Sequence, residues 1–244
     1  MLLTSMGTII RQPKGRLRLL AVALLAAAIA AAFAISAGSG ARAATAKVIT
    51  LGATASTPNP SCPRDPCQAV GKVTGFQAAA AGRNGLFRAP SNGKVVKWSI
   101  RLSKPAAKDI KFFNSFYGSP PKARIAILRR SNTTSPPRYK LLRQSPAEVL
   151  TPYFGQGGQT FVLNQPLGAK KDDVVALSIP TWAPAFAVNI SSRNVWRAGR
   201  APGKCNSKSD IRNGSAHQGV GNTRAYGCVY RGARLLYTAG FAPN

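Results

Sequence analysis

The chain has 244 residues and carries 34 lysines and arginines against six carboxylates, which gives a net charge of +28 at pH 7. So few carboxylates and a single histidine leave little material for acid–base catalysis, and the four cysteines lack the C-x-x-C spacing of zinc sites. A charge of this size attracts polyanions such as nucleic acid, acidic polysaccharide, cell-wall polymers or anionic lipid, although it also keeps an exported protein soluble.

Residues 1–43 have the organisation of a signal peptide. Four basic side chains between Arg11 and Arg18 precede an apolar run of 17 residues, and Ala41-Arg42-Ala43 resembles a cleavage site. Cleavage predicts a secreted protein with no membrane span. It would keep a net charge of +23, because five basic residues and no carboxylate leave with the signal. The alternative is an uncleaved N-terminal anchor with the rest of the chain exposed outside the cell.

Residues 44–67 are rich in Ala, Thr, Ser and Pro, which predicts an extended N-terminal segment. Four cysteines in an exported chain suggest two disulfides. Cys62 and Cys67 bracket a Pro-Arg-Asp-Pro turn, and Cys205 and Cys228 bracket a polar stretch. We therefore expect these two local bridges among the three possible pairings.

Residues 68–244 consist of short apolar runs separated by turn signals. The clearest alternation, Val96 to Leu102, predicts a strand with Trp98 in the core and a basic solvated face, whereas 123–129 is apolar on both faces and predicts an interior strand. Residues 105–117 favour a single short helix, with Ser103 as its cap. We predict an all-β fold, a two-sheet antiparallel sandwich of jelly-roll or immunoglobulin-like architecture with one short helix.

A charged turn, an apolar strand and an aromatic loop follow one another in residues 170–188. Val174–Ile179 has the composition of a central strand, which we expect Pro180 to end. The preceding Asp172-Asp173 pair has the form of a Ca²⁺ site at a strand entrance. Two lysines directly before it favour instead a polar turn whose carboxylates bond their own backbone. We expect neither a metal nor a cofactor.

Candidate catalytic residues are few and scattered. Glu148, Asp172, Asp173 and His217 would have to be brought together by the fold, and no G-x-S-x-G elbow is present. His217 lies in a polar stretch where a solvated histidine is the ordinary outcome. We predict that the protein is not an enzyme, and a hydrolase is the least favoured alternative.

Aromatic residues beside arginines are the better candidates for binding. We expect Trp182 in a loop at a sheet end, and Trp196 lies between Arg193 and Arg197. Exposed tryptophans stack on sugar rings or bases, and the arginines would hold phosphate or carboxylate. The alternative is that both indoles fill the core.

The predicted function is that of an exported, non-catalytic module. It would bind an anionic or carbohydrate polymer of the cell envelope or surroundings, through Trp182, Trp196 and the arginines near them. Basic residues are spread along the chain and no nucleic-acid-binding motif is present, so we expect no sequence-specific nucleic-acid recognition. A structural or protein-interaction domain without a ligand site is the competing prediction.

Overall fold

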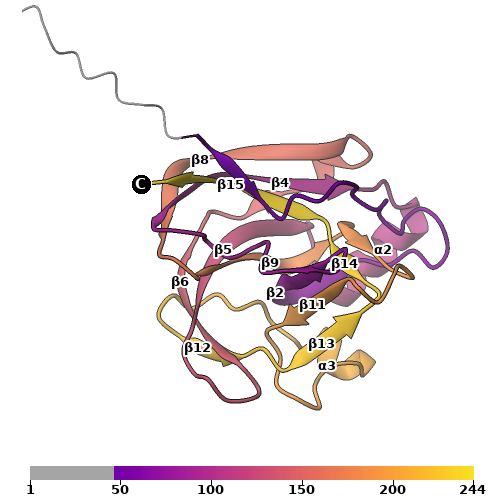
Figure 1. Cartoon of the computed structure of the whole chain (residues 1–244). Helices are drawn as coiled ribbons and strands as arrows, with labels where there is room; N and C mark the ends of the chain where they lie inside the picture. The colour runs from indigo at the N-terminus through magenta and orange to yellow at the C-terminus, as the bar shows by residue number, and fades with distance from the viewer. Residues whose placement is uncertain (1–46) are drawn as a thin grey trace, which may run out of the picture. The chain divides into compact units, whose positions relative to one another are not determined.

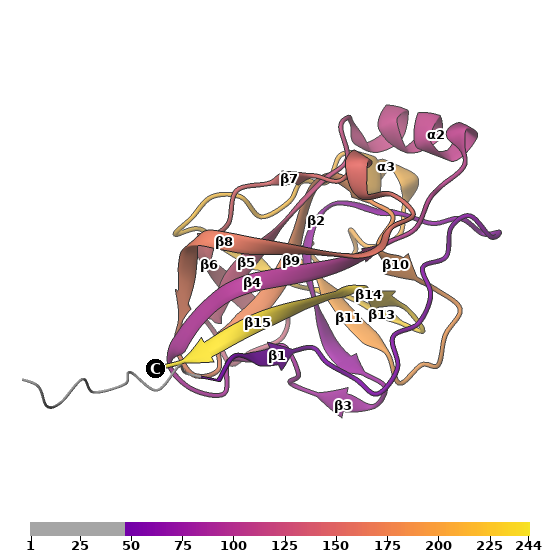
Figure 2. The same cartoon turned by 90° about the horizontal axis from the view of Figure 1, so that it is seen from above.

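Two antiparallel β-sheets face each other across an apolar core in the computed structural model, which describes residues 47–244 (Figures 1 and 2). This confirms the predicted all-β, two-sheet sandwich. The first sheet has four strands, in the order β1 (Ile49–Leu51), β15 (Tyr237–Pro243), β4 (Gly93–Leu102) and β8 (Gly157–Ala169). Because β1 belongs to this sheet, the sandwich begins within the segment predicted as an extended lead-in. The predicted signal peptide lies outside the described residues.

The second sheet has nine strands. Its main order is β12 (Thr223–Ala225), β6 (Arg138–Gln144), β5 (Lys122–Arg130), β9 (Val174–Ala183), β2 (Val70–Ala80), β11 (Val195–Ala198) and β13 (Cys228–Arg231). Two short strands pair beside it, β3 (Arg83–Asn84) with β2 and β7 (Glu148–Val149) with β5. A separate ribbon joins β10 (Phe186–Ala187) to β14 (Arg234–Leu235).

The nine-stranded sheet curls until its two edges approach each other. β12 and β13 stand at opposite ends of the strand order, yet only Tyr226 and Gly227 separate them in the sequence. Such a link reaches at most about 11 Å, whereas seven strands laid flat would separate the edges by roughly 29 Å. The sheet therefore has a concave face, and its other face, the inter-sheet face, packs against the four-stranded sheet.

Alternate residues of the central strands supply the two faces. In β9, Val175, Leu177 and Ile179 join the core between the sheets, while Val174 and Ala176 belong to a second apolar cluster on the concave face. All six residues from 174 to 179 are buried, which confirms the predicted central strand. The concave-face cluster consists of Phe76, Ala126, Leu128, Tyr139, Leu141, Val174, Ala176 and Tyr226.

Two local predictions about the strands are wrong. A bulge in β4 between Val95 and Lys97 shifts the alternation, so Val95 and not Val96 is buried beside Trp98. Pro180 does not end β9, which continues to Ala183. The strand passes the proline because its pairing with β2 is irregular there, and no ladder partner faces Pro180.

Two helices flank the sheets. Helix α2 (Ala107–Tyr117) confirms the predicted helix and ends at Gly118, whose φ of 97° suits a glycine. Ser103 does not cap it, because the Ser103 hydroxyl donates to the carbonyl of Pro184. Helix α3 (Lys208–Arg212) is short and lies in the stretch predicted as a polar loop. A single 3₁₀ turn covers Thr151–Tyr153.

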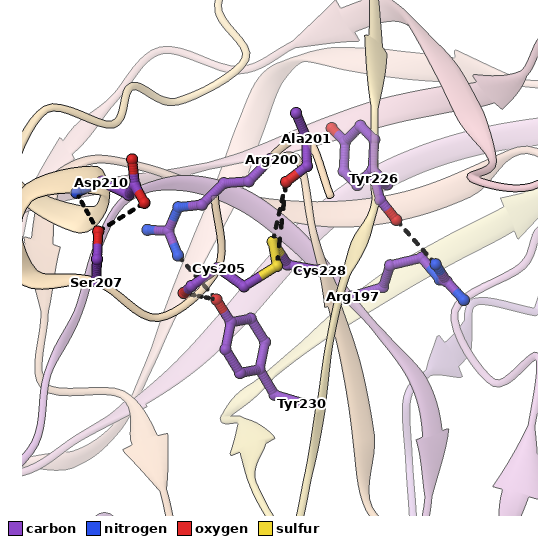
Figure 3. The surroundings of a disulfide bond; sticks show 9 residues. All are labelled: Arg197, Arg200, Ala201, Cys205, Ser207, Asp210, Tyr226, Cys228 and Tyr230. Carbon is purple, nitrogen blue, oxygen red and sulfur yellow. Dashed lines mark hydrogen bonds between the residues drawn. A yellow bond between two sulfur atoms is a disulfide. The ribbon is translucent and has the colours of Figure 1, made fainter. Parts of the chain in front are cut away.

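Both predicted disulfides are present, Cys62–Cys67 and Cys205–Cys228. The second one, drawn in Figure 3, fastens the segment 199–227. We call it the cover segment because His217 and Tyr226 attach it to the concave face before and after β12. Within residues 47–244, no helix combines the length and the apolar composition that a bilayer crossing requires.

Candidate anion-binding site

The concave face is plugged at one end by the cover segment. The backbone N–H of His217 donates to the hydroxyl of Thr74 at 2.9 Å, and that hydroxyl lies 2.8 Å from the hydroxyl of Ser178. The Arg124 guanidinium donates to the side chain of Gln218 at 2.7 Å. These bonds tie the plug to β2, β9 and β5 at this end of the concave face, whereas the other end is open.

That other end opens into a cavity of about 430 Å³, which we call the arginine pocket. Four parts of the chain surround it: β5, β11, the loop 131–137 between β5 and β6, and the segment that follows β3. Its floor is aromatic: the Phe76 and Tyr139 rings line it and meet edge to face with centroids 5.2 Å apart. Tyr226 does not line the cavity, but it supports Tyr139 from behind at 5.1 Å. This volume falls in the range typical of small-molecule sites.

Three arginines from separate parts of the chain line the pocket: Arg88, Arg130 and Arg197. Arg88 is brought there by a bridge between its backbone and Val174 of β9. The Arg130 guanidinium, at the end of β5, donates to the carbonyls of Asn132 and Thr133 at 2.7 and 3.1 Å, which also holds the loop 131–137 in place.

Arg197 is the least exposed of the three. It projects from β11 and donates to the carbonyl of Tyr226 at 2.8 Å, so its position depends on the cover segment (Figure 3). Burial lowers the pKa of the Arg197 guanidinium, and the neighbouring charge of Arg130 lowers it further, while Tyr139 acts in the opposite direction. A guanidinium stays protonated at neutral pH even so, and the cost of holding it partly buried is relieved when an anion binds.

No carboxylate balances these charges. None of the residues that line the arginine pocket is acidic. The two ion pairs found in residues 47–244 are Arg129–Asp173 and Lys204–Asp210, and neither includes a lining arginine. Three cationic side chains around an aromatic floor, with no internal counter-ion, form a site for phosphate, sulfate or carboxylate groups.

The neighbouring Arg129 shows what a balanced arginine looks like in this protein. Its guanidinium binds both carboxylate oxygens of Asp173 at 2.7 and 2.8 Å, and this contact raises the pKa of Arg129. Asp173 is buried and also accepts from the backbone N–H of Lys170, which confirms the predicted turn. With its carboxylate used in this way, Asp173 has no oxygen directed to a bound cation.

Trp182 is not at the surface. The residue lies within β9, is fully buried, and donates through Nε1 to the side-chain oxygen of Asn114 at 2.9 Å. Its ring packs 5.1 Å from Phe113 and 5.6 Å from Phe154. The expectation of an exposed stacking platform is wrong for this ring, because the indole anchors α2 to the sheet.

Trp196 is also buried, with 3% of its surface exposed, and its ring stacks on Tyr230 at 4.5 Å. It lies within β11, and its neighbour Arg197 points to the opposite face of that strand. Arg193 is exposed beyond the end of β11 and does not line the arginine pocket. Of the four predicted binding residues, the structure places only Arg197 in this site.

The structure does not bring the candidate catalytic residues together. Glu148 pairs with Ala123 near the start of β5, whereas Val174 pairs with Leu128 and so places Asp173 level with Arg129 at its end. The two acidic residues therefore lie roughly 20 Å apart along the strand. Residues 47–244 contain no cluster of His, Cys, Asp and Glu that suits a metal ion.

His217 is buried, and the expectation of a solvated side chain is wrong. Its Nε2 lies 3.0 Å from the carbonyl of Asn222, and its Nδ1 lies 3.3 Å from the Tyr226 hydroxyl. Burial lowers the pKa of His217, Arg224 lowers it further, and the Asn222 carbonyl acts in the opposite direction. This histidine belongs to the cover segment and forms part of the plug.

Sequence reasoning missed most of the arginine pocket. The adjacent pair Arg129-Arg130 at the end of an interior strand could have indicated a binding site, because loops that form such sites gather at strand ends. Arg88, Phe76 and Tyr139 carried no comparable signal. Their meeting depends on the curl of the nine-stranded sheet, which brings β2 and β6 together across β5 and β9.

Comparisons with known proteins give no relative from which a function could be transferred. A scan against protein-family models, a search of curated proteins and a search of solved structures each found no match to the chain. The basis for a proposed function is therefore the geometry and charge of the arginine pocket.

Proposed function

We propose that this is an exported, non-catalytic protein that binds an anionic polymer of the cell envelope or its surroundings, and that the arginine pocket holds one anionic group of that polymer. The observation that carries the proposal is the convergence of Arg88, Arg130 and Arg197 on a cavity lined by no carboxylate. A planar guanidinium group can donate two parallel hydrogen bonds to a pair of oxygens on a phosphate, sulfate or carboxylate.

A polymer fits better than a small free anion because the positive charge extends far beyond the pocket. The chain carries a net charge of +28, and its basic residues are spread along the sequence. A distributed charge of this kind attracts a long polyanion and releases its counter-ions, without selecting a sequence of bases. The pocket would add one specific contact to that general attraction.

The proposal is tested by retention of the protein on peptidoglycan, alginate, polyphosphate and DNA at increasing salt. The key variant is Arg88→Gln, because Arg88 is exposed and its loss leaves the fold intact. The matched control is Lys97→Gln, which removes an equal charge from an exposed position on β4 of the other sheet.

We expect retention on at least one polymer, weakened about tenfold by Arg88→Gln, because a hydrogen bond to a charged group is lost. Lys97→Gln should change retention much less. Equal weakening by both variants would mean that only general surface charge binds, and the pocket would have no part in it. Absence of retention on every polymer at low salt would sink the proposal.

A structural or protein-interaction domain is the second candidate. The observation that favours it is the burial of Trp182 and Trp196, which leaves neither ring exposed as the stacking platform that a polymer would need. This alternative is supported if none of the four polymers retains the protein and the Arg88→Gln variant elutes like the unchanged chain.

A further inference from the structure

A second cavity, of about 330 Å³, lies where the beginning of β2 meets α2, β11 and β13, and we call it the aromatic pocket. Four aromatic residues from four different elements line it: Tyr117, Phe186, Trp196 and Tyr230. Trp196 and Tyr230 are stacked, and the Phe186 ring meets Trp196 edge to face at 5.7 Å. Such walls favour a flat, partly apolar ligand.

Gly71 makes room for this wall. A Cβ atom at Gly71 would lie 2.5 Å from Cδ1 of Tyr117, closer than real Cβ contacts allow. The missing side chain therefore lets the Tyr117 ring of α2 lie directly against the backbone of β2.

The only charged groups in the wall are two arginines, Arg200 and Arg231. Arg200 is held firmly: its Nη1 donates to the Tyr230 hydroxyl and its Nη2 to the carbonyl of Gly71, each at 3.2 Å. The Tyr230 hydroxyl in turn donates to the carbonyl of Cys205 at 2.5 Å, next to the Cys205–Cys228 disulfide (Figure 3).

Two buried donors in this wall lack partners among the described residues. They are Nε1 of Trp196, a side chain that is 97% buried, and Nε of Arg200. Asp210 of α3 accepts from the Ser207 hydroxyl, as Figure 3 shows, and pairs with Lys204 at 3.2 Å. Arg200 is therefore a fixed cation beside an aromatic wall without a carboxylate of its own.

Tyr117 adds a neutral hydroxyl to this arrangement. Burial raises the pKa of the Tyr117 hydroxyl above its ordinary value, and the nearby charge of Arg200 opposes this only in part. The hydroxyl therefore keeps its proton at neutral pH and can donate it in a hydrogen bond.

We propose that the aromatic pocket binds one carboxylate-bearing ring, whose carboxylate lies between Arg200 and the Tyr117 hydroxyl and whose ring packs on the aromatic wall. The cavity is at the small end of the usual range for ligand sites, so it suits a single ring and not a chain of them. A uronic acid sugar and an aromatic acid share this chemistry. The site is separate from the arginine pocket and does not depend on the function proposed for it.

The test is a nuclear magnetic resonance titration of the protein with D-glucuronate and with benzoate. D-glucose and benzamide are the matched neutral compounds. The indole N–H signal of Trp196 reports on the aromatic pocket, and that of Trp98, buried in the inter-sheet core, is the internal control. Because the chain has three tryptophans, the Trp98→Phe and Trp182→Phe variants together assign the indole signals.

We expect at least one acid to shift the Trp196 signal in a saturable way while the Trp98 signal stays fixed, and its neutral counterpart to bind at least about tenfold more weakly. Which acid binds tells a sugar from an aromatic ligand. A lack of saturation with both acids, or equal binding of the neutral compounds, would overturn the proposal.

Variants separate this site from the rest of the molecule. Tyr117→Phe keeps the ring and removes the hydroxyl, so the affinity for the acid should fall about tenfold. Tyr153→Phe, which alters a ring packed on Phe161 elsewhere, should leave it unchanged. Arg88→Gln should also leave it unchanged, and an equal loss in that variant would show that the acid binds the arginine pocket instead.

Discussion

The two faces of the nine-stranded sheet are built from alternate residues of the same strands, yet they are covered differently. On the inter-sheet face, Leu177 and Ile179 meet the buried side chains of the four-stranded sheet, and the core is closed. On the concave face, the cover segment closes one end and leaves the arginine pocket at the other. A sheet seals a face along its whole length, whereas a loop seals only the part that it reaches.

Adjacent arginines at the end of β5 show the same contrast at the scale of single residues. Arg129 binds the buried carboxylate of Asp173 through two hydrogen bonds, so its charge is balanced within the protein. Arg130 points to the concave side, bonds only backbone carbonyls and lines the arginine pocket. Because successive side chains of a strand point to opposite faces, Arg129 has a structural role while its neighbour Arg130 is available to an anion.

The largest effect should come from emptying the inter-sheet face. Leu177→Ala removes a fully buried side chain there and should lower the free energy of unfolding by about 3–5 kcal/mol. Leu141→Ala, an identical change in the concave-face cluster, should cost less, because the covering residues 219–222 can settle into the space. Urea unfolding of both variants measures the difference, and equal losses would contradict the contrast between the two faces.

An intermediate effect should follow from releasing the cover segment. Replacing Cys205 and Cys228 by serine opens a loop with a sequence separation of 23, which should cost about 3 kcal/mol. Polyanion binding should weaken as well, since Arg197 is held by the carbonyl of Tyr226 in that segment. The control variant replaces Cys62 and Cys67 by serine. It opens a shorter loop, so it should lower the free energy of unfolding by about 2 kcal/mol and leave polyanion binding unchanged. Thermal melts and salt-dependent retention distinguish the two.

The smallest effect should be a pH dependence of the plug. The folded-state pKa of His217 lies below its ordinary value of 6.5, so the unfolded chain takes up a proton first as the pH falls. Stability should therefore decrease below about pH 6.5 and stop decreasing below the folded-state pKa. The charged neighbour is Arg224, and the other groups around the ring are the Tyr226 hydroxyl and the Asn222 carbonyl.

Urea unfolding at about pH 7.5 and about pH 5.5 measures this effect while the carboxylates remain ionised. His217→Gln should remove the difference between the two pH values, whatever it does to the absolute stability. A difference that persists in the variant would assign the pH dependence to another group.

The local part of the fold could be predicted from the sequence. The alternation around Trp98, the two-sided apolar run at 174–179, the helix ending at Gly118 and both disulfides depend on neighbouring residues, and all are present. The bulge that buries Val95 and the passage of β9 through Pro180 depend on the partner strands instead. Such features are settled by pairing between distant segments, which a single sequence does not display.

The candidate site was less predictable for a similar reason. Of its residues, only Arg197 was predicted to bind a ligand. That prediction rested on its neighbour Trp196, which is buried and not exposed as expected. The remaining parts of the arginine pocket come from residues 76 to 197 and meet because the sheet curls. The excess of positive charge in the sequence indicated an anionic ligand, whereas the position of the proposed site depends on the curl of the nine-stranded sheet.

The curl also bears on how the protein avoids sticking to itself. A sheet edge offers unpaired N–H and C=O groups to any strand of another molecule, which is a common route to aggregation. Here the two edges of the larger sheet turn toward each other at Tyr226 and Gly227. Among the described residues, the smaller sheet keeps two edges, the 3-residue β1 and the 13-residue β8, and Pro166 removes one backbone donor from β8. The longer edge offers more unpaired groups. At high concentration, misassembly of this protein should therefore begin at β8.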